Sequence, residues 1–263
     1  MERPDDPEDR ARHVAARLAE LRARVARAEG AAGRQPGAVR VLLAGKTMDA
    51  ATVRAALLAD ADARAAGSGT APVLLGENRV QELVAKAPVL ADLAPTWHLI
   101  GPLQSNKVAA VLRWAHAVES VADVTLARRL SERVRERTVP LDVWVQVNVS
   151  GEPTKHGVAP GAAHDLALQV AALPGLRLAG FMTVGANTPD EAVVRSGYAL
   201  LRRVRDDVVA SGAPGTAEAH GLSMGMSRDL EAAVAEGATV VRIGTAVFGA
   251  RPAATGTGSA PAR

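Results

Sequence analysis

Short apolar runs alternate with amphipathic stretches along most of the chain, and this alternation predicts an α/β fold, a single (β/α)8 TIM barrel. Eight apolar runs occur over roughly 250 residues, the usual length of such a barrel. Hydrophobic residues make up 48% of the 263 residues, which is enough for one large core. Aromatic residues are only 2%, so that core must be built from Ala, Val and Leu.

The first predicted element is an amphipathic helix over residues 5–30. Its apolar residues recur at steps of four, three and four from Val14 to Val25, and Gly30 ends the pattern. The eight predicted strands follow at residues 41–44, 73–75, 97–100, 117–121, 141–147, 176–184, 220–224 and 239–243.

Helical stretches separate these strands, for example residues 122–137 and 189–210, which carry apolar residues on one face. The pattern predicts no helix after the eighth strand, so we expect the N-terminal helix to cover the wall that a final helix would cover. A Gly-rich segment, residues 65–72, is expected to form a flexible loop inserted before the second strand. The expected organisation is therefore one barrel over residues 1–249 and a disordered tail over residues 250–263.

Composition excludes several classes of protein. The chain has no cysteine, which excludes disulfides, thiolate metal sites and cysteine nucleophiles. Its net charge is only +3, and its arginines are scattered among Asp and Glu rather than gathered in a basic block, so we expect no nucleic-acid partner. The start of the chain is acidic and polar, and no later stretch reaches the run of about 18 apolar residues that a membrane span needs. We therefore expect a cytoplasmic protein with no membrane partner.

Lys46 stands at the end of the first predicted strand and before the polar start of a helix. Functional groups of a TIM barrel sit on the loops that follow the carboxyl ends of its strands. Only four of the 31 basic residues are lysines, and a lysine at such a strand end can lose its proton and form an imine, which an arginine cannot do. The structural alternative is a lysine that forms a salt bridge at the barrel rim.

Gly- and hydroxyl-rich stretches follow the seventh and eighth strands, "SMGMS" at residues 223–227 and "RIGTAVFG" at residues 242–249. Loops at these places commonly form a phosphate site, so a primary amine facing them suggests a phosphorylated aldehyde held as an imine. The alternatives are that SMGMS only makes a turn and a helix cap, and that Arg242 pairs with a carboxylate such as Glu218. His98, with no second ligand at metal spacing, is expected to be a core histidine, and no metal site is predicted.

The chain also carries a set of motifs in this order: "KT" at Lys46, "GENRVQEL", "WHLIGPLQSNKV", "VQVNVSGEPTKHGV", "GFMTVGA" and, most specifically, "LSMGMSRDLEAAVAEGATVVRIGTAVFGARP". Over residues 41–252 the chain resembles the YggS/PROSC family of pyridoxal 5′-phosphate (PLP)-binding proteins, also called PLP homeostasis proteins. The resemblance implies a barrel similar to the N-terminal barrel of alanine racemase, of fold-type III, with PLP held as a lysine aldimine on the first strand. Lys46 matches that lysine.

The resemblance also implies which residues bind the cofactor. They are Lys46 as the Schiff base, Asn78, Ser223, Met224, Ser227, Arg242, Gly244 and Thr245. Among them, Arg242 would face the pyridine nitrogen of PLP. The phosphate would be held by Ser227, Gly244 and Thr245. Ser223 and Met224 would lie beside them, and Asn78 would lie near the ring face or its hydroxyl.

The resemblance implies a protein that stores, buffers or delivers PLP in intracellular PLP homeostasis, and not an efficient enzyme. An arginine at the pyridine nitrogen keeps that nitrogen unprotonated and so weakens carbanion chemistry. Racemases on this barrel use a second base, usually a tyrosine from a separate domain, whereas the single tyrosine here, Tyr198, stands in the middle of a predicted helix. No catalytic residue is therefore assigned. The alternatives are a fold-type III PLP enzyme, such as a small amino-acid racemase with Lys46 as its base, and a Schiff-base aldolase.

PLP-dependent apo-enzymes are the candidate protein partners, and a monomer or a weak dimer is expected. The chain departs from the family pattern in several places. Gly45 precedes Lys46 where Ser is usual, and Met48 and Asp49 follow in place of a Thr-Lys-Pro type sequence. Pro102 stands where a histidine is frequent, and the insertion at residues 65–72 is longer than usual. None of these departures removes a group that bonds the cofactor, but they leave the shape of the loops and any partner surface open.

Overall fold

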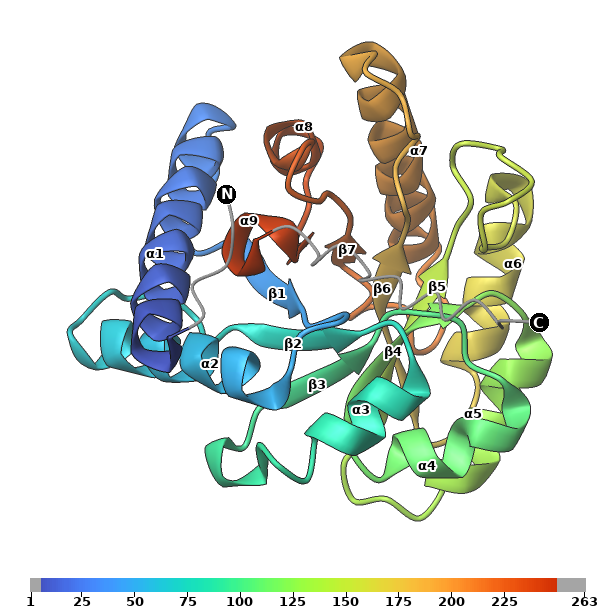
Figure 1. Cartoon of the computed structure of the whole chain (residues 1–263). Coiled ribbons are helices and arrows are strands. Elements are labelled where there is room, and N and C mark those ends of the chain that lie inside the picture. The colour runs from blue at the N-terminus through green and yellow to red at the C-terminus, as the bar shows by residue number, and fades with distance from the viewer. Residues whose placement is uncertain (1–5, 250–263) are drawn as a thin grey trace, which may run out of the picture.

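Eight parallel strands close into a barrel in chain order, from β1 to β8, in a computed structural model that describes residues 6–249 (Figure 1). Strand β1 pairs with both β2 and β8, and Val41 lies opposite Val241 at the seam that closes the barrel. Each strand overlaps a predicted one, which confirms the predicted TIM barrel. The strands are β1 Arg40–Ala44, β2 Leu74–Glu77, β3 Thr96–Leu99, β4 Ala115–Val121, β5 Leu141–Gln146, β6 Leu176–Met182, β7 Gly221–Ser223 and β8 Val240–Ile243.

Most strand residues are buried, because helices cover the outside of the barrel and side chains fill its inside. In β2 and β8 every residue is buried. Alternate residues of a strand point to opposite faces, so the large core lies between strands and helices while a smaller cluster fills the barrel interior. That inner cluster consists of Leu42, Leu74, Trp144, Met182 and Val240.

The helices that surround the strands begin at chemically recognisable positions. In α1, α2, α5 and α7 an aspartate precedes the helix and its carboxylate accepts a backbone N–H of the first turn: Asp6, Asp49, Asp123 and Asp190. The α-helices are α1 Pro7–Ala31, α2 Ala50–Ala65, α3 Val80–Lys86, α4 Val108–Leu112, α5 Val124–Val134, α6 Pro160–Ala171, α7 Glu191–Ala210, α8 Leu230–Ala235 and α9 Thr245–Phe248. Two 3₁₀ helices, η1 Ala91–Leu93 and η2 Ser105–Lys107, complete the described elements.

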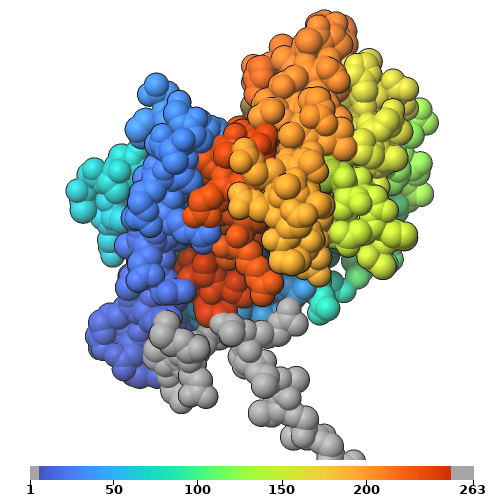
Figure 2. All heavy atoms as spheres, turned by 90° about the horizontal axis from the view of Figure 1, so that it is seen from above, coloured from blue at the N-terminus to red at the C-terminus, as the bar shows by residue number. Residues whose placement is uncertain are grey.

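The N-terminal helix α1 packs against α2, α8 and α9 (Figure 1). Figure 2 shows the blue α1 directly beside the red segment near the C-terminus, with the orange α7 next to it. The residues from Val14 to Val25 that set the predicted period are buried against the barrel. The prediction that no helix follows the eighth strand was wrong, because the four residues of α9 come directly after β8. This single turn is too short to cover the wall, which α1 covers as expected.

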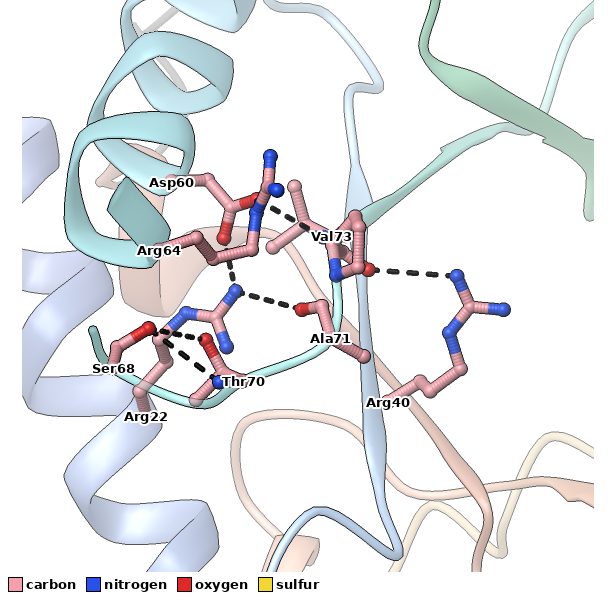
Figure 3. A network of polar contacts seen from close by, with 9 residues as sticks. Arg22, Arg40, Asp60, Arg64, Ser68, Thr70, Ala71 and Val73 are labelled. Atoms are coloured by element: carbon pink, nitrogen blue, oxygen red, sulfur yellow. Dashed lines mark hydrogen bonds and ion pairs between the residues drawn. The ribbon is translucent and has the colours of Figure 1, made fainter. Parts of the chain in front are cut away.

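The Gly-rich segment 65–72 leaves α2 as a loop, and its far end is fastened to the helices (Figure 3). Arg22 of α1 donates a hydrogen bond to the carbonyl of Ala71 at 3.1 Å. The buried carboxylate of Asp60 receives hydrogen bonds from Arg22, from Arg64 Nε at 3.1 Å and from the Val73 N–H at 3.3 Å. The loop is therefore tied at the entry to β2, and within its Gly-rich part the hydroxyls of Ser68 and Thr70 lie 2.9 Å apart (Figure 3).

Within residues 6–249, no helix combines the length and the apolar character that crossing a membrane requires. The predicted tail, residues 250–263, lies outside the described residues.

Candidate functional site

A wide cavity of about 1040 Å³ opens at the carboxyl ends of the barrel strands. Its walls come from the loops after β1, β2, β3, β5, β6, β7 and β8, and from the starts of α7 and α8. Functional groups of this fold collect at that end because each strand delivers its following loop to the same opening. Six of the predicted site residues line the cavity: Lys46, Asn78, Ser227, Arg242, Gly244 and Thr245.

Lys46 follows β1 and is half-buried at the cavity wall. Within residues 6–249, its amine has no hydrogen bond or ion pair. Two other lysines differ: Lys86 Nζ lies 2.8 Å from Glu77 Oε1, and Lys155 Nζ lies 2.6 Å from Glu152 Oε1. The alternative of a salt-bridging lysine at the rim therefore does not fit Lys46 within the described part of the chain.

The loop after β7 is held in a fixed shape by Asp229, which stands just before α8. Asp229 accepts the backbone N–H of Met226 at 2.6 Å and the phenol of Tyr198 at 2.7 Å. Gly225 turns the chain with φ of +90°, and a Cβ there would lie 2.4 Å from the Cβ of Ala233. SMGMS thus does make a turn, as the structural alternative states, and the turn presents Ser227 to the cavity.

The loop after β8 forms the adjoining part of the wall. Gly244 precedes α9 and Thr245 begins it, and the first N–H groups of a helix have no acceptor within the helix. Thr245 is exposed and Ser227 is half-buried. The hydroxyls of Ser227 and Thr245, together with the backbone N–H groups at the start of α9, offer hydrogen-bond donors to an anionic group in the cavity.

Arg242 lies at the cavity wall at the end of a buried chain of polar groups. Its Nη1 donates to Ser223 Oγ at 2.8 Å and its Nη2 donates to the carbonyl of Thr183 at 2.6 Å. The Ser223 hydroxyl donates in turn to Glu119 Oε2 at 2.6 Å. Glu119 Oε1 lies 2.6 Å from His98 Nδ1. The guanidinium is therefore held by β6 and β7 and linked to a carboxylate on β4.

The charges of Glu119 and Arg242 in this buried series of polar groups stabilise each other. Burial alone would raise the pKa of Glu119, but its hydrogen bond with His98 and the positive charge of Arg242 hold that pKa below its usual value. Burial lowers the pKa of Arg242, and the Glu119 carboxylate opposes this shift. Glu119 is thus the buried counter-charge that lets a cation remain at the cavity wall.

Several predicted details need correction. Ser223 and Met224, expected beside a phosphate, are fully buried and do not line the cavity. Ser223 instead bridges the arginine and the β4 carboxylate. Glu218 is not the partner of Arg242, since Glu119 has that role. His98 is buried as expected, and it pairs with the carboxylate of Glu119.

Two further residues of the cavity were missed. Lys155 lines it and donates to the carbonyl of Gly185 at 2.7 Å. Asp229 lines it and shapes the loop after β7. The signal for Glu119 was present in the sequence, because "AVES" places a charged residue inside an otherwise apolar strand. Glu119 and Ser223 are 104 residues apart in the sequence, so no local pattern indicates that they interact.

Tyr198 is buried in α7, and its phenol is engaged with Asp229. Burial and the neighbouring Asp229 raise the pKa of this phenol well above its ordinary value. The group therefore stays protonated near neutral pH and does not act as a base.

The fold and the cavity together define a class of protein: a single barrel whose cavity is lined by a primary amine just after the first strand and by an arginine on the neighbouring strand β8. The family model of the alanine racemase N-terminal domain matches residues 11–252. A curated relative, the pyridoxal phosphate homeostasis protein of Pseudomonas aeruginosa, is 44% identical over 241 residues, which cover 90% of this chain and 96% of the relative. The chain belongs to the family of pyridoxal phosphate homeostasis proteins.

Solved structures agree with this assignment. A protein from Bifidobacterium adolescentis, described as unknown, is 40% identical with a TM-score of 0.84, over 94% of this chain and 98% of that chain. PipY of Synechococcus elongatus, solved with PLP bound, is 32% identical with a TM-score of 0.74, over 90% of this chain and 100% of PipY.

Proposed function

We propose that this protein binds PLP in the cavity and acts in PLP homeostasis in the cytoplasm, as a store, buffer or carrier of the cofactor. The observation that carries the proposal is the amine of Lys46, which has no polar partner among residues 6–249 and lies in the same cavity as Arg242 and the loops after β7 and β8. Membership of the family and the PLP bound to PipY support it.

The residues present fit the chemical groups of PLP. Lys46 offers a primary amine for the aldehyde. The Arg242 guanidinium has five N–H donors. Two of them bind the Ser223 hydroxyl and the Thr183 carbonyl, so others remain for the pyridine nitrogen. Ser227, Gly244 and Thr245 would hold the phosphate, and Asn78 would lie near the ring.

The same residues favour binding over turnover. Bound PLP supplies an aldehyde that a lysine can hold covalently and a ring that can withdraw electrons from a substrate. Arg242 would keep the pyridine nitrogen unprotonated because a second positive charge there is repelled, which makes the ring a weak electron acceptor. Tyr198, as a buried and protonated phenol, offers no second base. We therefore propose a protein without efficient catalysis, whose loaded form passes PLP to PLP-dependent apo-enzymes.

The test begins with the visible spectrum of the protein incubated with PLP and purified. Borohydride reduction followed by peptide mass mapping should place the pyridoxyl mass on the peptide that contains Lys46. A mass on Lys86, Lys107 or Lys155 instead would refute the assignment of the lysine. Steady racemisation of an added amino acid would show that the protein is an enzyme after all.

Delivery is tested by mixing the PLP-loaded protein with a PLP-dependent apo-enzyme and following the enzyme's activity. Activity should appear with the loaded protein, and a free-PLP trap in the solution distinguishes direct transfer from release. If no enzyme activity appears while the loaded protein keeps its PLP, storage is the remaining role.

A further inference from the structure

Three charged side chains from β2 and α3, two of them buried and here together called the corner cluster, bind the backbone on both sides of Lys46: Glu77, Glu82 and Lys86. Lys86 Nζ donates to the carbonyl of Gly45 at 2.7 Å, to Glu77 Oε1 at 2.8 Å and to Glu82 Oε2 at 3.3 Å. The same oxygen of Glu82 accepts the backbone N–H of Thr47 at 3.0 Å. The carbonyl before Lys46 and the N–H after it are therefore both bound to one cluster.

The corner that carries Lys46 needs such support because its backbone is strained. Thr47 has φ of +67°, in the left-handed region that a β-branched residue rarely adopts. Such a conformation persists only where the surrounding structure over-determines it, and it is found preferentially at functional sites. Without the acceptor on Glu82 and the donor on Lys86, the corner would relax to a common conformation and redirect the side chain of Lys46.

The cluster is packed tightly in a space that a neighbouring glycine leaves open. A Cβ on Gly45 would lie 2.5 Å from Glu77 Oε1, so this glycine leaves the space that the cluster occupies. The side chain of Glu77 is fully buried and that of Lys86 is only 9% exposed. Glu77 Oε2 has no hydrogen-bond partner among the described residues. Buried ion pairs seldom repay the cost of removing the charges from water, so this arrangement calls for another explanation.

Lys46 supplies that explanation, because within residues 6–249 its own side chain has no polar partner that fixes its direction. We propose that the corner cluster positions Lys46: Lys86 and Glu82 hold the strained corner in the conformation that turns the amine into the cavity, and so set the affinity for PLP. This inference rests on the proposed function, since it assigns positioning residues to the same site.

The first experiment needs no cofactor. The exchange rate of the Thr47 amide hydrogen, measured by NMR in the PLP-free protein, reports whether the corner is held. Lys86→Met removes the donor to Gly45, and Glu82→Ala removes the acceptor of Thr47. Both variants should exchange this amide at least about tenfold faster, which corresponds to ~1.4 kcal/mol of local stability. Lys107→Met is the matched control, because this lysine lies in η2 and does not line the cavity, and its Thr47 exchange should equal that of wild type.

The second experiment measures PLP binding by the same proteins. The Kd for PLP should rise at least about tenfold in Lys86→Met and Glu82→Ala, and borohydride should trap less pyridoxyl mass on Lys46 at equal PLP concentration. The control Lys107→Met should bind PLP as wild type does.

The outcomes separate this inference from the proposed function. If wild-type protein binds no PLP, the proposed function fails, and wild-type exchange of the Thr47 amide in the variants would still refute the cluster's hold on the corner. If wild-type protein binds PLP, either readout at its wild-type value in a folded variant overturns the proposal. Should Lys86→Met not fold, Glu82→Ala decides, because the Glu82 side chain is 20% exposed at the edge of the cluster.

Discussion

Glu77 is a fully buried carboxyl group, and its ionisation should make the stability of the protein depend on pH near neutrality. Burial, which the Lys86 ammonium offsets only in part, raises its pKa from 4.5 to about 7. Between these two values the unfolded chain has lost the proton while the folded chain keeps it, so the folded state binds more protons. The stability that this group contributes is therefore fully present below pH 4.5 and is lost as the pH rises through about 7.

Glu77→Gln removes this titration while keeping an amide oxygen that can accept a hydrogen bond from Lys86. The two pKa values change the contribution of Glu77 by about 2.5 kcal/mol between about pH 5 and about pH 8. The free energy of unfolding of wild type, relative to the variant, should fall by roughly this amount over that range. Urea unfolding of both proteins at both pH values measures it. A difference that stays constant within about 0.5 kcal/mol would refute the assignment of a raised pKa to Glu77.

Three further perturbations test the site. Lys46→Ala should abolish the visible absorption that PLP gives the wild-type protein yet leave the thermal melt of the PLP-free protein nearly unchanged, because the amine has no partner within residues 6–249; a large drop in Tm without PLP would indicate a structural lysine. Glu119→Gln should lower the free energy of unfolding by about 3 kcal/mol, a fall in Tm of roughly 6–12 °C, since Arg242 loses its buried counter-charge; an unchanged melt contradicts this. Arg242→Glu should destabilise the protein, because it places a second carboxylate near Glu119, and should speed deuterium exchange at the α-carbon of amino acids added to the loaded protein. Destabilisation with unchanged exchange would contradict a role at the pyridine nitrogen.

The sequence by itself determined the barrel, because the signals for strands and helices are local. Eight apolar runs with amphipathic stretches between them are read within short windows, and the parallel closure follows from their regular alternation. The sequence also allowed us to predict Lys46, Ser227 and Gly244 as site residues, since the loops that follow barrel strands all reach the same opening. The departure at α9 is a single turn, too short to leave a periodic pattern.

Only the tertiary structure decided which polar residues meet behind the cavity wall. Ser223 and Glu119 are 104 residues apart in sequence, yet they share a hydrogen bond because β4 and β7 point side chains into the same barrel interior. Whether a residue such as Ser223 faces the cavity or the core depends on the stagger of neighbouring strands, which no local pattern records. The hold of Lys86 on Gly45 is decided in the same way, because it requires α3 to pack beside the end of β1. Local periodicity therefore specified where the site lies, and long-range packing specified which buried charges support it.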